Sequence, residues 1–310
     1  MRADPGIVAR VGALAIIAML AGCAPAAQTD AVLTPAVADD HGLDALSQIE
    51  VLADIPYGTD PLQRLDVCLP PASGQTSLAA MLVVHGGSWA RGDKADPAWR
   101  SVCQWLAAEG YLAVSVNYRL APADVFPAAF DDVRSVVAWL RAPEQVQRFL
   151  IDPERIGALG GSAGGNLVAL LGTSGSGDLG SGSRVAAVVE LSGPIDLTGL
   201  AVRDEFVPVQ LAYLGCAVPQ GCAKAAEASA TYAIDATDPP FFIAHSTDEM
   251  IPIGQAELLV AGLRAAAVPV DYARVEGTQH SLAMLDAELK ARIAAFLAEH
   301  LAEPTTLGAG

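Results

Sequence analysis

The sequence predicts an α/β fold: a mostly parallel, twisted sheet with helices on both faces and a small helical insertion. Short apolar runs alternate with helical stretches along most of the 310 residues. Strands separated by helices run parallel and are covered on both faces. Hydrophobic residues make up 52% of the chain and charged residues only 17%, so a large core is available and wholesale disorder is excluded.

The elements follow in order from their periodicity and flanking residues. The first two strands have no helix between them and predict an antiparallel edge. Pro127 opens a helix with Asp131 and Asp132 in its first turn, where the helix dipole favours them. Expected strands are 48–54, 63–69, 79–85, 111–117, 155–160, 184–191, 240–245 and 270–275, and expected helices are 97–109, 127–148, 163–172, 253–266 and 284–301.

One stretch does not fit this alternation. Residues 197–232 have no strand period and predict a helical insertion over the carboxyl edge of the sheet, where open α/β sheets bind ligands. The α/β domain is therefore expected over 48–302, with a disordered tail at 303–310.

The charge balance excludes one class of partner. The chain has 18 Lys and Arg against 35 Asp and Glu, a net charge of −17. Such a chain repels phosphate backbones, so nucleic-acid binding is not expected.

The N-terminus has the features of an export signal. Arg2 and Arg10 precede a ten-residue apolar run, 11–20, which is too short to cross a bilayer as a helix. The next residues, 20–23 (Leu-Ala-Gly-Cys), resemble the bacterial lipoprotein cleavage box. That resemblance implies a signal peptide over 1–22, lipidation of Cys23, a flexible tether over 23–47, and anchoring to the cell-envelope membrane after export. The alternative is an ordinary secretory peptide with a chance cysteine.

With Cys23 lipidated, four cysteines remain in an oxidising compartment. Cys216 and Cys222 bracket a short loop and are expected to form a disulfide. Cys68 and Cys103 are then left for each other, the alternative being two buried free thiols.

The strongest chemical signal is the run 160–165, GGSAGG, which follows a strand and precedes a helix. A serine on such a sharp turn exposes its hydroxyl, and Gly160 and Gly164 allow the strand and helix to approach closely. A phosphate-binding loop would need a lysine after the last glycine, where Asn166 stands. Ser162 is therefore the candidate nucleophile.

A serine nucleophile needs an oxyanion site and a base. The segment 85–89, HGGSW, resembles the oxyanion loop of esterases and lipases, which implies that the amides of Gly86, Gly87 and Ala163 hold the oxyanion. His85 is expected to be a structural hydrogen-bonder.

His280 is the candidate base because it lies in a loop between the last strand and the last helix. Of the others, His41 and His300 are expected at the surface, and His245 is expected to brace a loop at a strand end. The chain order of serine, acid and histidine differs from the orders in chymotrypsin and subtilisin.

Four segments carry a resemblance to a known family: HGGSW, NYRLAP at 117–122, GGSAGGN and a D-x-x-x-P step at 248–252. Over about residues 48–300 the chain resembles the α/β-hydrolase esterases of the hormone-sensitive-lipase and kynurenine-formamidase-like groups. Two features depart from the lipase branch: the loop is not HGGG, and Gly161 stands where that branch often has Asp. The resemblance implies a serine hydrolase of small or short-acyl esters that needs no cofactor or metal. An amidase, formamidase or peptidase on the same scaffold is the alternative, and a catalytically silent surface binding protein is a more distant one.

The resemblance leaves two candidates for the acid. The family's acid stands four residues before a proline that opens the next helix, which selects Asp248 before Pro252. It also usually stands four residues beyond a histidine such as His245, which selects Glu249. We expect Asp248 because a proline fixes where a helix starts. Trp89, residues 207–213 and Met284 are expected to line the acyl pocket.

Overall fold

A computed structural model describes residues 46–72, 74–199, 203–218 and 220–303 of the chain. The predictions for the signal peptide, Cys23, most of the tether, His41 and the tail from residue 304 lie outside the described residues. None of the helices in the described ranges combines the length and the apolar character that crossing a membrane requires.

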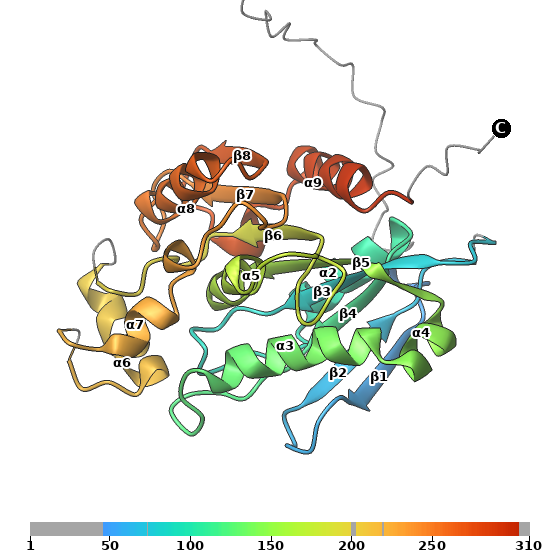
Figure 1. Ribbon diagram of the computed structural model, residues 1–310, viewed down its shortest axis with the longest axis horizontal. Helices are drawn as coiled ribbons and strands as arrows, with labels where there is room; N and C mark the ends of the chain where they lie inside the picture. Colours follow the sequence, from blue (N-terminus) through green and yellow to red (C-terminus); the bar gives the residue numbers. More distant parts are fainter. Residues whose placement is uncertain (1–45, 73, 200–202, 219, 304–310) are drawn as a thin grey trace, which may run out of the picture. The chain divides into compact units, whose positions relative to one another are not determined.

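The centre of the fold is an eight-stranded sheet in the order β1-β2-β4-β3-β5-β6-β7-β8 (Figure 1). β1 pairs with β2, and β2 with β4, in antiparallel fashion; all other neighbours are parallel. The α/β fold and its antiparallel edge are therefore confirmed. The strands are β1 Val51–Pro56, β2 Arg64–Cys68, β3 Leu78–Val84, β4 Leu112–Val116, β5 Ile151–Gly161, β6 Ala187–Leu191, β7 Phe241–Ser246 and β8 Val270–Val275.

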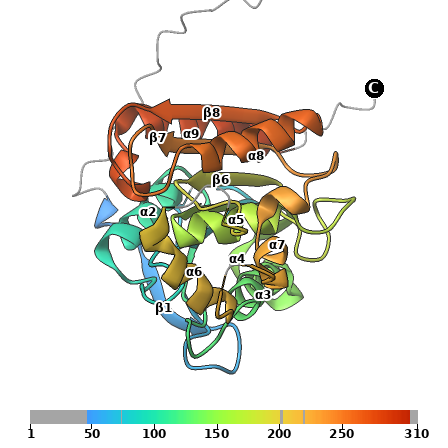
Figure 2. The ribbon, with the colours of Figure 1, turned by 90° about the vertical axis from the view of Figure 1, so that its left-hand side faces the viewer.

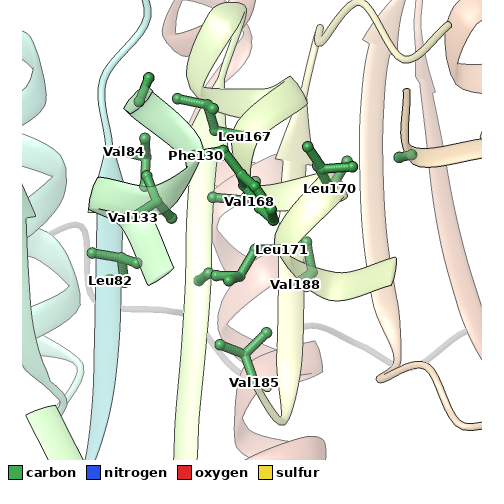
Figure 3. Close-up of a cluster of buried hydrophobic side chains, with 14 of the residues drawn as sticks. Leu82, Val84, Phe130, Val133, Leu167, Val168, Leu170, Leu171, Val185 and Val188 are labelled. Carbon is green, nitrogen blue, oxygen red and sulfur yellow. The ribbon is translucent and has the colours of Figure 1, made fainter. Parts of the chain in front are cut away.

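Helices cover both faces of the sheet, and each face has its own apolar core. Alternate side chains of β3 divide between the two: Leu82 and Val84 join one cluster, and Met81 and Val83 join the other. Figure 3 shows the first cluster, in which Phe130 and Val133 pack with the residues of the helix after β5. The first face carries α3 (Ala128–Arg141), α5 (Ala163–Thr173) and α8 (Gly254–Ala265), and the second carries α2 (Pro97–Ala108) and α9 (Ala287–His300).

Two helices differ by more than one residue from their predicted bounds. The helix expected over 127–148 is broken into α3 and α4 (Pro143–Phe149), because the residue before a proline avoids the helical conformation and Ala142 is extended. The last helix begins at Ala287 and not at 284, since Asp286 caps it by accepting a hydrogen bond from the Leu289 amide at 2.8 Å.

The expected insertion is helical, and its elements are η1 (Asp204–Phe206), α6 (Val207–Leu214), α7 (Ala223–Glu227) and η2 (Ala230–Tyr232). Tyr213 of α6 stacks on Trp89 after β3, with ring centroids 4.3 Å apart, and accepts a hydrogen bond from the Phe126 amide at its carbonyl. Asn166 of α5 donates to the Ala228 carbonyl at 3.0 Å. These contacts hold the insertion against loops at the carboxyl ends of the strands, and Figure 2 shows α6 in front of α5.

Both predicted disulfides are present. Cys68 of β2 is bonded to Cys103 of α2, and Cys216 is bonded to Cys222. The first joins the antiparallel edge to a covering helix, and the second closes the loop between α6 and α7.

Candidate active site

Ser162 stands at the turn between β5 and α5, with φ 55° and ψ −124°. This is the left-handed region, which non-glycine residues adopt at a cost. The turn is held because the Ser162 amide donates to the Leu191 carbonyl at 2.8 Å. A Cβ on Gly160 of β5 would lie 2.3 Å from the Gly164 carbonyl oxygen of α5, so the expected close approach of strand and helix is confirmed.

The loop after β3 places two glycine amides beside this serine. A Cβ on Gly86 would be 3.1 Å from the Ser162 Cβ, and both Gly86 and Gly87 line the same pocket as Ser162. Ala163 is the first residue of α5, so its amide belongs to the unpaired N-terminal group of that helix. These are the three positions expected to provide oxyanion donors.

His85 is a structural residue, as expected. Its Nδ1 is 2.7 Å from the Gly86 carbonyl, its ring stacks on Tyr118, and the Tyr118 hydroxyl donates to the His85 carbonyl at 2.9 Å. Burial lowers the pKa of this imidazole, so it is neutral and Nδ1–H is the donor to Gly86. Because the C=O and N–H of a trans peptide point in opposite directions, this bond fixes the direction of the Gly87 amide.

His280 lies in the loop after β8, on the same pocket as Ser162. Three hydrogen bonds fix the loop: the Gly277 amide donates to Thr247, the Ser246 hydroxyl donates to the Gln279 carbonyl, and the Ser281 amide donates to the Ser192 hydroxyl. His280 Nδ1 is hydrogen-bonded to Oε2 of Glu249, whose side chain is fully buried.

The expectation that Asp248 lies against His280 is wrong. The Asp248 side chain is 81% exposed and its nearest cation is Arg203, at 3.8 Å. Counting four residues back from Pro252 selects the wrong carboxylate because the helix does not start at this proline. Ile253 is the N-cap of α8 and Gly254 is its first residue. The rival count, from His245, selects the residue that the structure places at His280.

The pocket that joins Ser162 and His280 has a volume of about 510 Å³. Trp99 forms one wall, and its ring lies 3.1 Å from the position that a Cβ on Gly161 would take. Phe206 and Met250 add further apolar lining, and Arg91 and Asp93 add polar groups.

The predicted pocket wall was wrong, because none of the expected residues, Trp89, 207–213 and Met284, lines this pocket. Trp89 and Met284 are buried in the two cores and do not line the pocket. Trp99 and Phe206 come from a helix and a turn far apart in the chain. Only their apolar character was visible in the sequence, and core residues share that character.

Behind the serine turn lies a buried carboxyl group that the sequence did not reveal. Glu190 of β6 is fully buried, its Oε1 accepts a hydrogen bond from the Gly193 amide, and a Cβ on Gly165 would be 2.7 Å from that oxygen. Burial raises the pKa of Glu190 to about 8, and the charge of Glu249 adds to this rise. Glu190 therefore carries a proton at neutral pH.

This proton makes the stability depend on pH. The unfolded chain loses it near pH 4.5, while the folded chain keeps it up to about pH 8, so stability falls as pH rises through this interval. Between pH 6.5 and 8, Glu190 lowers the free energy of unfolding by about 2 kcal/mol. Below pH 6.5, His85 and His245, whose pKa values burial lowers, oppose this trend because only the unfolded chain gains their protons.

Glu190→Gln keeps an acceptor for the Gly193 amide and removes the titration. Between pH 6.5 and 8, we expect the free energy of unfolding measured in urea to fall by about 2 kcal/mol less in this variant than in the wild type. An equal decline in both proteins would mean that Glu190 ionises normally.

Among the residues described, no group of three or more His, Cys, Asp or Glu side chains is arranged to hold a metal ion. The site is thus made of a serine, a histidine, a buried carboxylate and backbone amides. Such a set supports nucleophilic catalysis at a carbonyl carbon.

The chain is similar to known esterases. The BD-FAE family profile matches residues 65–263. Two curated relatives come from Mycobacterium tuberculosis (strain ATCC 25618 / H37Rv): the probable carboxylic ester hydrolase LipM is 32% identical over 265 residues, and the esterase LipC is 32% identical over 242 residues. The matches cover 81% and 74% of this chain, and the chain spans only 60% and 59% of those relatives.

A similar fold occurs among solved structures. A truncated carbohydrate esterase from gut microbiota superposes with a TM-score of 0.72 at 22% sequence identity, covering 82% of this chain and 97% of that one. At this identity the likeness concerns the fold.

Proposed function

This chain belongs to the BD-FAE family and has the α/β-hydrolase fold, and from this premise we propose that it is a serine hydrolase of carboxylic esters. One observation carries the proposal: Ser162, the glycine amides of residues 86 and 87, and a histidine paired with a buried glutamate meet at one pocket. The names of the two mycobacterial relatives, an ester hydrolase and an esterase, support the same reaction class.

In the proposed mechanism, Ser162 Oγ attacks the ester carbonyl while Nε2 of His280 takes its proton. Glu249 accepts a hydrogen bond from Nδ1–H of His280, which fixes the tautomer and stabilises the imidazolium. The amides of Gly86, Gly87 and Ala163 donate to the oxyanion. His280 then protonates the leaving alcohol, and a water molecule activated by the same imidazole releases the acyl group from Ser162.

We propose a small or short acyl group for the substrate. Trp99 lies beside Gly86 of the oxyanion loop and Gly161, which precedes the serine, and so limits the depth available next to the reacting carbon. The pocket of about 510 Å³ is shared between the acyl and alcohol parts.

A panel of p-nitrophenyl esters from acetate to laurate, with acetyl p-nitroanilide as the matched amide, tests the proposal. Hydrolysis of the short esters, faster than that of laurate or of the anilide and absent in Ser162→Ala, is expected. Faster cleavage of the anilide would assign an amidase. No turnover of any member would favour a binding protein on the same fold.

We also propose that the protein is exported and anchored to the bacterial cell envelope through Cys23. Residues 20–23 resemble the lipoprotein cleavage box, and the two disulfides of the described chain suit an oxidising compartment. Two or three acyl chains would anchor the protein stably.

Replacing the lipidated residue tests this localisation. In a bacterial host fed a clickable palmitate analogue, Cys23→Ser is expected to lose the label and to leave the membrane fraction or stay unprocessed. Cys216→Ser, which removes another cysteine, should stay labelled. Label that survives Cys23→Ser would contradict lipidation at this residue.

A further inference from the structure

His245 is a buried histidine that the proposed reaction does not use, although it contacts the acid. It lies near the end of β7 and is fully buried. Its Nε2 is 3.1 Å from Oε1 of Glu249 and 2.9 Å from the Ile251 carbonyl oxygen. Glu249 therefore has one imidazole at each carboxylate oxygen: His245 at Oε1 and His280 at Oε2.

The surroundings of His245 define its protonation state. Both groups facing Nε2 are oxygen atoms, so Nε2 carries the hydrogen. It donates this hydrogen to the Ile251 carbonyl, while Oε1 of Glu249 has no hydrogen-bond partner among the residues described. Nδ1 is buried and has no hydrogen-bond partner in the described part of the chain. Burial lowers the pKa of this imidazole, so it is neutral and Nδ1 carries no proton.

A neutral donor at this place has a specific consequence for Glu249. A glutamate has one more rotatable bond than the aspartate that we expected from the sequence, so it has more freedom to lose when it is held in one orientation. The Nε2–H of His245 donates to the Ile251 carbonyl and so closes the turn that carries Glu249, while the ring edge lies against Oε1 and leaves Oε2 for His280. Because His245 is uncharged, it does not cancel the negative charge that stabilises the imidazolium of His280.

We infer that His245 is a positioning residue: its Nε2–H bond to the Ile251 carbonyl holds the turn that places the carboxylate of Glu249 against His280. This inference rests on the proposed function, since it assigns a role within the same site. It also explains the spacing of the acid: the residue four positions beyond His245 is the one that its imidazole reaches.

Three variants separate the hydrogen bond from the volume of the ring. The amide nitrogen of His245→Gln reaches the position of Nε2, that of His245→Asn reaches only the position of Nδ1, and His245→Leu has no donor. With p-nitrophenyl acetate, we expect kcat of the glutamine variant within tenfold of the wild type. We expect the asparagine and leucine variants to lose about 10²-fold in kcat with little change in KM, as misplaced catalytic groups do.

A double-mutant cycle gives a readout that a merely structural role would not move. If His245 acts through Glu249, His245→Asn should lower kcat about 10²-fold in the wild type and less than threefold in a Glu249→Gln background. Equal losses in both backgrounds, or equal activities of the Gln and Asn variants, would overturn the inference. A wild type without esterase activity would instead refute the proposed function, so the two failures are distinguishable.

Discussion

Ser162→Ala is expected to reduce kcat for p-nitrophenyl acetate by up to about 10⁶-fold, because no other group can form the acyl-enzyme. The fold should not change. The backbone bonds that hold the turn, from the Ser162 amide to Leu191 and from the Asn166 amide to the Ser162 carbonyl, are kept by alanine. Stopped-flow and steady-state assays give the activity, and thermal unfolding gives the stability.

Ser88→Ala is a suitable control, since Ser88 also lines the pocket but is not assigned a role. It should keep most of the activity. If Ser162→Ala retained more than a few per cent of wild-type kcat while remaining folded, another nucleophile would have to be sought.

Glu249→Gln is expected to lower kcat by about 10⁴-fold, whereas Asp248→Asn should cost less than about tenfold. An amide at position 249 can donate to Nδ1 of His280 and so favour the wrong imidazole tautomer. Glu249 is fully buried against His280, but the carboxylate of Asp248 is exposed and faces Arg203. An exposed ion pair at 3.8 Å contributes little, so its loss should leave catalysis and stability nearly unchanged.

The two variants form a matched pair, because each replaces a carboxylate by its own amide at neighbouring positions. The values of kcat and KM for both, together with their thermal unfolding, decide between the two carboxylates. The opposite ranking would return the acid to Asp248 and would mean that the loop rearranges when substrate binds.

The sequence was sufficient for elements whose signals are local. β8 was expected over 270–275 and is found there, because Pro269 and Gly277 bound a short stretch with Val and Tyr and fix both of its ends. The break between α3 and α4 was also encoded locally, in Pro143, but the helical periodicity on both sides concealed it. The start of α9 was missed because a cap at Asp286 depends on a single side-chain bond.

The same difference between local signals and tertiary contacts explains which residues of the site could be predicted from the sequence. Ser162 and His280 could be predicted because the strand, turn and helix around each are continuous in sequence. The acid could not, since it depends on where the loop of seven residues between β7 and α8 turns inward. Its position follows from a contact with His245 across that loop, and Glu190 and Trp99 likewise take their places from tertiary packing.

Fluorophosphonate labelling followed by peptide mass spectrometry shows whether Ser162 is an activated nucleophile. We expect one adduct, on the peptide that contains Ser162, no adduct in Ser162→Ala, and much slower labelling in Glu249→Gln than in Asp248→Asn. An adduct on a different residue, or a folded wild-type protein that does not react, would show that Ser162 is not the activated nucleophile.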